Sequence, residues 1–161
     1  MTLMNEDWFF SGEGWICDVR VAGVLVRNGK ILLQRERNGL EYAVPGGHIK
    51  MGETLEDGLR REWREETGAE IRCQRMLWTE ECFWEWQGKK AHNLSFYYRI
   101  ALEDAAGLAD DGALHSHKDN SHILLEWVKL ETLENILVYP AFIKEALFQA
   151  DAPVRHFVTR A

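Results

Sequence analysis

Residues 47–69 read GHIKMGETLEDGLRREWREETGA and carry the clearest local pattern in the chain. The pattern predicts a helix over residues 54–67, because apolar side chains recur every fourth residue, at Leu55, Leu59 and Trp63. Thr54 is a suitable N-cap, and Gly68 provides the C-terminal stop. We therefore expect this helix to dock on a sheet through one apolar stripe.

Three glutamates on the same helix are spaced i, i+3 and i+4, at Glu62, Glu65 and Glu66. This spacing places their carboxylates on one face, where like charges repel by a few tenths of a kcal/mol per pair. Side chains that offer only oxygen ligands from a rigid face suit a hard cation such as Mg²⁺ or Mn²⁺. The alternative is a solvated acidic helix face with no ligand.

The loop before the helix has features that suit a close approach of its backbone to a metal or a phosphate. Its glycines, which permit tight turns, are Gly46, Gly47 and Gly52. Arg61 follows one position before Glu62 and is able to reach back to Glu53, which would fix the loop against the helix.

With these residues the stretch resembles the Nudix box, a pattern of glycine, glutamate and arginine positions at fixed spacing. The residues in register are Gly47, Glu53, Arg61, Glu62, Trp63, Glu65, Glu66, Gly68 and Ala69. Seven fixed positions at fixed spacing make this a specific motif. Trp63 is bulkier than the usual aliphatic residue and Ala69 is small, but neither departure removes a candidate ligand.

The resemblance implies an α/β (α+β) protein with a Nudix-type α/β/α sandwich, in which a mixed sheet lies between helices. It also implies a MutT-like pyrophosphohydrolase that needs Mg²⁺, or Mn²⁺, and acts on a nucleoside diphosphate linked to another moiety. The catalytic residues would be Glu62, Glu65 and Glu66, which would also bind the metal with a backbone carbonyl of Gly47. Structural support would come from Gly47, Glu53, Arg61 and Gly68.

Outside the box the pattern alternates between strands and turns. Strands are expected at 21–26 and 31–34, joined by a hairpin at Asn28-Gly29. Further strands are expected at 42–44, 69–79, 83–86, 94–102, 123–130 and 154–159. Residues 103–121 are predicted to be a loop, and 133–149 a helix that Pro140 interrupts. A mixed sheet packed between two or three helices is the expected architecture.

The chain has 161 residues, which suits a single domain over residues 1–161, with 1–15 and 151–161 as peripheral terminal segments. Its net charge of −7 argues against long nucleic acid as the main partner and leaves a small nucleotide as the expected substrate. We expect neither a membrane span nor a signal peptide, because no apolar run approaches about 20 residues and the first ten residues lack a basic segment. An odd number of cysteines without paired spacing, Cys17, Cys73 and Cys82, favours a reducing cytoplasm over a disulfide framework.

The sequence leaves several alternatives open. A non-catalytic nucleotide-sensing or protein-binding module would use the same fold, and an RNA-end hydrolase is disfavoured by the charge. The candidates for an additional acid or base are Glu80, Glu81, Glu85, Asp110, Asp111, His115, His117 and Asp119. A zinc site formed by His115, His117 and His122 is a less favoured hypothesis. Trp8, Trp15, Trp78, Trp84 and Trp86 are candidates for the core, a dimer seam or a nucleobase platform. The substrate-binding residues are unknown, and the oligomeric state is open, although homodimers are frequent among proteins of this resemblance.

Overall fold

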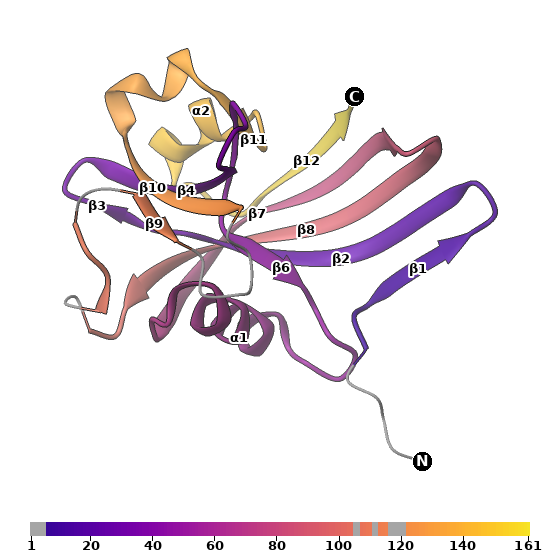
Figure 1. Ribbon diagram of the computed structural model, residues 1–161, viewed down its shortest axis with the longest axis horizontal. Helices are drawn as coiled ribbons and strands as arrows, with labels where there is room; N and C mark the ends of the chain where they lie inside the picture. Colours follow the sequence, from indigo (N-terminus) through magenta and orange to yellow (C-terminus); the bar gives the residue numbers. More distant parts are fainter. Residues whose placement is uncertain (1–5, 105–106, 111–112, 116–121) are drawn as a thin grey trace.

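The computed structural model describes residues 6–104, 107–110 and 122–161, together with the backbone of residues 113–115. Its strands form two six-stranded sheets flanked by short helical segments (Figure 1). The first sheet has the order β1-β2-β8-β7-β12, with β6 also paired to β2. Its strands are β1 (Phe9–Gly12), β2 (Trp15–Val24), β6 (Gly46–His48), β7 (Ile71–Trp86), β8 (Lys89–Leu102) and β12 (Arg155–Arg160). The sheet is mixed, because β2–β8 and β7–β12 are parallel pairs.

The second sheet has the order β11-β5-β4-β10-β9, with β3 paired to β4. Its strands are β3 (Val26–Arg27), β4 (Lys30–Glu36), β5 (Glu41–Ala43), β9 (Ala113–His115), β10 (Ile123–Lys129) and β11 (Leu137–Tyr139). The predicted hairpin is confirmed: Arg27 pairs with Lys30, and Asn28 and Gly29 between them have positive φ angles of 51° and 72°. Both central residues therefore adopt the conformation that this tight turn requires.

Helix α1 (Leu55–Thr67) lies on one side of the sheets and helix α2 (Ile143–Ala146) on the other (Figure 1). Under α1, Leu59 and Trp63 are almost fully buried in a cluster with apolar side chains of both sheets. Around α2, Ile143 packs in a second cluster that includes Trp78. The two helical layers enclose the strands, so the predicted α/β/α class is confirmed, although the strands divide between two sheets.

The predicted helix over 133–149 is helical at its two ends and is wrong over residues 136–142. The 3-10 helix η2 (Leu130–Asn135) is followed by strand β11, and helix α2 and the 3-10 helix η3 (Leu147–Gln149) come after Pro140. Strand β11 pairs in parallel with β5, so that Leu137 lies opposite Glu41. Pro140 cannot continue a helix, and this pairing satisfies the backbone groups that precede it.

Strand β7 also differs from the expectation, because one strand covers the two segments predicted at 69–79 and 83–86. The register against β8 shifts between Cys73 and Arg75 and again between Met76 and Trp78. Such bulges add an unpaired residue and bend a strand without ending it. They interrupt the alternation that sequence reasoning relies on.

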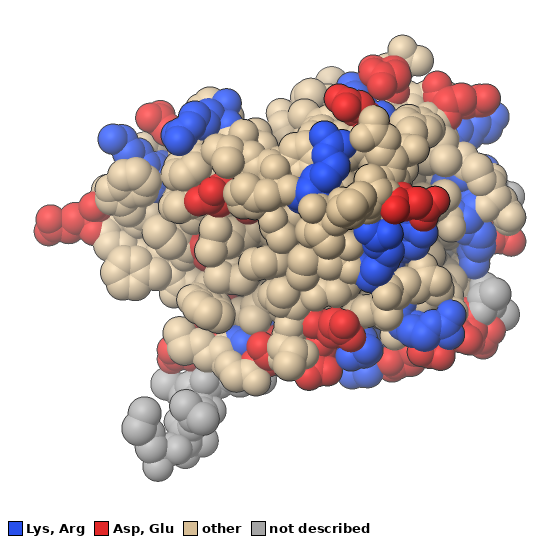
Figure 2. Space-filling view, turned by 180° about the vertical axis from the view of Figure 1, so that it is seen from behind, with Lys and Arg blue, Asp and Glu red and all other residues tan. Residues whose placement is uncertain are grey.

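The far ends of β2, β7 and β8 project beyond α1 (Figure 1). Large apolar side chains there are partly exposed: Trp8, Phe9, Phe10, Trp15, Trp84 and Trp86. Only Trp63 and Trp78 among the tryptophans are fully buried. Figure 2 shows mostly uncharged residues on the face in view, with basic and acidic residues interspersed among them. Within the described part of the chain, no helix is long and apolar enough to cross a bilayer.

The close packing of Trp63 against Gly23 can be tested by mutation. A Cβ at Gly23 would stand 2.7 Å from Nε1 of Trp63 and 2.8 Å from Cδ1 of Ile100, so Gly23→Ala should overpack the core. We expect a loss of about 1–3 kcal/mol in unfolding free energy, measured by urea denaturation. Addition of Trp63→Leu to the Gly23→Ala variant should restore part of this stability, because the smaller side chain leaves space for the new Cβ.

The matched control is Gly107→Ala, because a Cβ at Gly107 meets no atom within 4 Å. Equal destabilisation by Gly23→Ala and Gly107→Ala would contradict the close packing of Gly23 against the helix.

Candidate active site

Local interactions fix both ends of α1. Thr54 accepts a hydrogen bond at Oγ1 from the backbone N–H of Asp57 at 3.1 Å, which is the predicted N-cap. Gly68 ends the helix with φ 73°, the left-handed conformation that favours glycine, and its N–H donates to the Arg64 carbonyl. The predicted bounds of the helix are therefore confirmed, and its acidic face has a defined orientation.

Arg61 joins the helix to the loop that precedes it. Its Nε and Nη2 donate to the two carboxylate oxygens of Glu53 at 2.6 and 2.9 Å, which is a bidentate pair. Nη1 donates to Oε1 of Glu62 at 2.7 Å and to Oε2 of Glu65 at 3.4 Å. Nη2 also donates to the backbone carbonyl of His48 at 3.0 Å. One guanidinium thus contacts three carboxylates and the end of strand β6, from which the loop starts.

The Arg61–Glu53 pair is strongly ionic. Hydrogen bonds from Arg61 are the main reason why the pKa of Glu53 lies below its ordinary value, with a smaller contribution from the Lys50 backbone N–H. The same pair raises the pKa of Arg61, and the side chains are only 16% and 19% exposed. The contact to Glu53 expected from the sequence is therefore confirmed, and it holds the loop against the helix.

Glu62 lies directly against Gly47. A Cβ at Gly47 would stand 2.3 Å from Cδ and from Oε2 of Glu62, closer than any real contact. Gly46 is equally confined, since a Cβ there would stand 2.1 Å from the carbonyl oxygen of Val21. Only glycine therefore lets strand β6 lie between β2 and the Glu62 carboxylate, which is 6% exposed.

The structure brings Gly47, Glu53, Arg61, Glu62 and Glu65 together along one side of α1. Glu66 lies one turn beyond Glu62 and is half-buried. No group of three Asp, Glu, His or Cys side chains in the described ranges is already arranged as a metal site. The residues still fit a hard divalent cation, because the donors are carboxylates and the Glu62 carboxylate lies against the Gly47 backbone.

A second polar group lies beside the box and was missed by sequence reasoning. Asp18 on β2 is 7% exposed, and its Oδ2 accepts a hydrogen bond from Nε2 of His48 at 2.8 Å. Its Oδ1 accepts from Nδ2 of Asn93, whose Oδ1 accepts from Nε1 of Trp84. Arg20 Nη1 lies 3.9 Å from Asp18 Oδ2. These residues are far apart in sequence and have no shared spacing, so only the strand register brings them together.

Asp18 remains charged in spite of its burial. Desolvation raises its pKa, but the hydrogen bonds from His48 and Asn93 and the charge of Arg20 outweigh this effect. The pKa of Asp18 therefore lies below its ordinary value, and each of its carboxylate oxygens accepts a hydrogen bond.

The candidates for an additional acid or base lie apart from one another. Glu80 is buried and accepts hydrogen bonds from Tyr97 Oη and Thr159 Oγ1, both at 2.7 Å. Glu81 contacts His156, and Asp110 forms an ion pair with Arg27 at 2.6 Å. Glu85 lies opposite Lys90 in the β7–β8 ladder. Asp111, His117 and Asp119 lie outside the described residues, as does the side chain of His115, so the zinc idea is untested.

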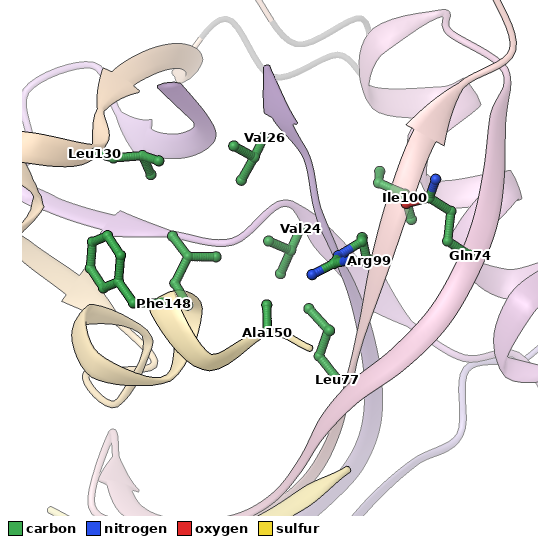
Figure 3. A pocket seen from close by; sticks show the side chains of 10 residues that line it. Val24, Val26, Gln74, Leu77, Arg99, Ile100, Leu130, Phe148 and Ala150 are labelled. Carbon is green, nitrogen blue, oxygen red and sulfur yellow. The ribbon is translucent and has the colours of Figure 1, made fainter. Parts of the chain in front are cut away.

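A pocket of about 300 Å³ lies elsewhere in the fold, between β2, β7, β8 and η3 (Figure 3). Its wall is mainly apolar, with Val24, Leu77 and Leu147, and its polar groups come from Gln74 and Arg99. No residue of the box lines it. We therefore assign the candidate site to the loop and helix around Arg61 and not to this pocket.

All three cysteines are free and half-buried, as expected for a chain without a disulfide framework. Burial raises the pKa of the Cys82 thiol to about 11, with smaller contributions from the charges of Glu80 and Asp18. The thiol is therefore protonated at neutral pH and is a poor nucleophile.

Comparison with known proteins gives a family match over most of the chain. The family model described as NUDIX domain matches residues 18–149. An ADP-ribose pyrophosphatase of Methanocaldococcus jannaschii is 43% identical over 62 residues, which is 37% of each chain. An m7GpppN-mRNA hydrolase of Xenopus laevis is 41% identical over 80 residues, 45% of this chain and 26% of that protein. The aligned parts thus make up 37% and 26% of these relatives' own length.

Solved structures agree with this match at the level of the fold. A MutT protein from Bacillus halodurans superposes with a TM-score of 0.61 at 16% identity, with 89% of each chain covered. An ADP-ribose pyrophosphatase from Streptococcus suis gives a TM-score of 0.57 at 18% identity, covering 86% of this chain and 98% of that chain. At these identities the likeness establishes the fold alone.

The Arg61–Glu53 pair should make stability depend on pH. Because the pKa of Glu53 is lowered on folding, its contribution is complete above the ordinary value of 4.5. It disappears as the pH falls through the lowered pKa. We expect Glu53→Gln to cost about 2 kcal/mol of unfolding free energy near neutral pH, and progressively less below about pH 4.

Urea denaturation of wild type and Glu53→Gln at several pH values measures this difference. Glu56→Gln is the control, because Glu56 pairs with Arg60 at an exposed site and should contribute little. A difference between wild type and Glu53→Gln that does not change with pH would show that the ion pair is not its cause.

Proposed function

Because the chain belongs to the Nudix family, we propose that it is a metal-dependent pyrophosphohydrolase that cleaves a nucleoside diphosphate linked to another moiety. The observation that carries this proposal is the Arg61 network, in which one cation contacts Glu53, Glu62 and Glu65. Several carboxylate oxygens meet there, and these are the ligands that a hard divalent cation needs.

In this proposal Glu62, Glu65 and Glu66 hold Mg²⁺ or Mn²⁺ together with the backbone carbonyl of Gly47. When bound, the cation supplies charge neutralisation of the phosphates and a lower pKa for water. Arg61 keeps Glu62 in place through its 2.7 Å hydrogen bond, and Glu53 in turn keeps Arg61 in place. One of the three helix carboxylates accepts the proton of the attacking water, which is the remaining task in phosphoryl transfer.

The reaction splits the diphosphate bridge of the substrate by attack of water on one phosphorus. The bond from that phosphorus to the bridging oxygen breaks, and each product leaves with one of the two phosphates. The substrate class is supported by the relatives, which include an ADP-ribose pyrophosphatase and a MutT-like protein of Streptomyces ambofaciens. Nucleotide sugars, ADP-ribose, dinucleoside polyphosphates and modified nucleoside triphosphates all contain the required bridge.

Two other functions are weaker. The similarity to an mRNA hydrolase favours action on an RNA end, but the net charge of −7 and the absence of a basic patch on the face in Figure 2 disfavour a long RNA partner. A non-catalytic nucleotide-sensing or protein-binding module would not need the full set of carboxylates that this helix retains.

Substitution of the helix carboxylates tests the catalytic assignment. Glu65→Gln and Glu66→Gln should each lower hydrolysis by roughly 100-fold or more, because a neutral amide is a poor metal ligand and a poor base. Chromatography of the products from a panel of Mg²⁺–nucleotide substrates measures the rates. Glu56→Gln, at a half-exposed residue of the first turn, should leave them unchanged. Wild-type rates in both Glu65→Gln and Glu66→Gln would contradict the assignment.

Metal binding separates the enzyme from the non-catalytic module. Mg²⁺ or Mn²⁺ that binds only the folded protein should stabilise wild type by about 2.7 kcal/mol at a concentration 100 times the Kd. A thermal shift series over millimolar concentrations measures this effect. The double variant Glu65→Gln/Glu66→Gln should lose it. No stabilisation of wild type by either metal would favour the non-catalytic module.

A further inference from the structure

A continuous series of hydrogen bonds connects the projecting end of the first sheet with Arg61. It begins at Trp84 Nε1, passes through the Asn93 amide to Asp18, and continues to the His48 imidazole. His48 then contributes its backbone carbonyl to Arg61 at 3.0 Å. Residues of β7, β8, β2 and β6 thus reach the guanidinium that contacts the box carboxylates.

Asp18 is the centre of this series. Burial of a carboxylate is costly unless its oxygens are hydrogen-bonded, and each oxygen of Asp18 has a side-chain donor. An apolar residue in place of Asp18 on β2 would stabilise the sheet without needing hydrogen-bond donors. The arrangement does, however, fix the position of the His48 side chain, which is 31% exposed at the edge of the sheet.

We propose that Asp18 is a positioning residue for the metal ligands of the box, acting through His48. Residues Gly47 and His48 are consecutive on β6, and a side chain anchored at His48 restrains the peptide between them. That peptide contains the Gly47 carbonyl. The carbonyl of the following residue, His48, accepts a hydrogen bond from Arg61. This inference rests on the proposed function, since it concerns the same metal site.

The register supports the argument. Arg20 on β2 lies opposite His48 and Val21 lies opposite Gly47, and backbone hydrogen bonds from Gly23 N–H to Pro45 and from Ile49 N–H to Val19 continue the pairing on either side. These ladder hydrogen bonds hold the backbone of β6 but do not by themselves fix the His48 side chain. The contact between Asp18 and His48 adds a side-chain restraint at the end of β6 that leads into the loop carrying Glu53.

Glu80 provides a matched comparison on the same sheet. It is 5% exposed, against 7% for Asp18, and it also accepts two side-chain hydrogen bonds. Its donors are Tyr97 and Thr159, and neither of these two contacts leads to the box. Replacement of Glu80 should therefore affect stability to a similar extent without affecting the metal ligands.

The experiment measures Mn²⁺ affinity directly, by titration calorimetry in the absence of nucleotide. Asp18→Ala should weaken Mn²⁺ binding roughly 10-fold, in the range known for residues that support metal ligands. Asp18→Asn retains an acceptor for Asn93 and a polar partner for His48, and should stay within about two-fold of wild type. Glu80→Ala should lower the melting temperature while keeping the wild-type Mn²⁺ affinity.

A double-mutant cycle keeps the test decisive. His48→Ala should weaken Mn²⁺ binding as Asp18→Ala does, and the double variant should be no worse than either, because both remove one restraint. If Asp18→Ala does not fold, Asn93→Ala serves in its place, with an expected loss of about three-fold. The proposal is overturned if Asp18→Ala and Asn93→Ala bind Mn²⁺ like wild type, if Glu80→Ala loses as much affinity, or if the two effects simply add.

The two proposals fail in different ways. Wild type that binds Mn²⁺ but hydrolyses none of the nucleotides contradicts the proposed reaction and leaves the role of Asp18 intact. Wild type that hydrolyses nucleotides while Asp18→Ala retains full Mn²⁺ affinity contradicts the role of Asp18 alone.

Discussion

The candidate site depends on the Arg61 guanidinium, which contacts the Glu53, Glu62 and Glu65 carboxylates at once. Two unit charges 4 Å apart interact with about 4 kcal/mol at an effective dielectric constant of 20. The attraction of a single guanidinium therefore holds three like-charged groups close together. The network thus gathers carboxylate oxygens, the ligand type that a hard divalent cation prefers, at one place.

Close backbone contacts make this network possible. Gly46 and Gly47 let β6 lie against β2 on one side and the Glu62 carboxylate on the other. Gly58 plays a corresponding part within α1, since a Cβ there would stand 2.5 Å from Cδ1 of Ile49 and 3.1 Å from Oε2 of Glu53. Three glycines therefore define how near the helix, the loop and the sheet approach one another, and Arg61 connects the parts at that separation.

The sequence predicted what depends on local interactions. The bounds of α1, the Asn28-Gly29 turn and the Arg61–Glu53 pair follow from caps, positive φ angles and contacts between near neighbours. The sequence-based prediction failed where the pairing of distant strands determines the structure, as in β11, whose parallel pairing with β5 replaces part of a predicted helix. The Asp18 network was missed for the same reason, because Asp18 and Asn93 are 75 positions apart and meet only through the β2–β8 register.

Trp63 shows how the chain accommodates a departure from the usual box. Its Nε1 is buried with no acceptor among the described residues, which costs about 1–3 kcal/mol, so the indole is present for its packing and not for a hydrogen bond. Gly23 on β2 provides the space, since a Cβ there would stand 2.7 Å from that nitrogen. The larger side chain is thus absorbed between the helix and the sheet. Because the compensation lies in the core, the spacing of Glu62, Glu65 and Glu66 along α1 is unaffected, and the bulk of Trp63 is no argument against a metal at the acidic face.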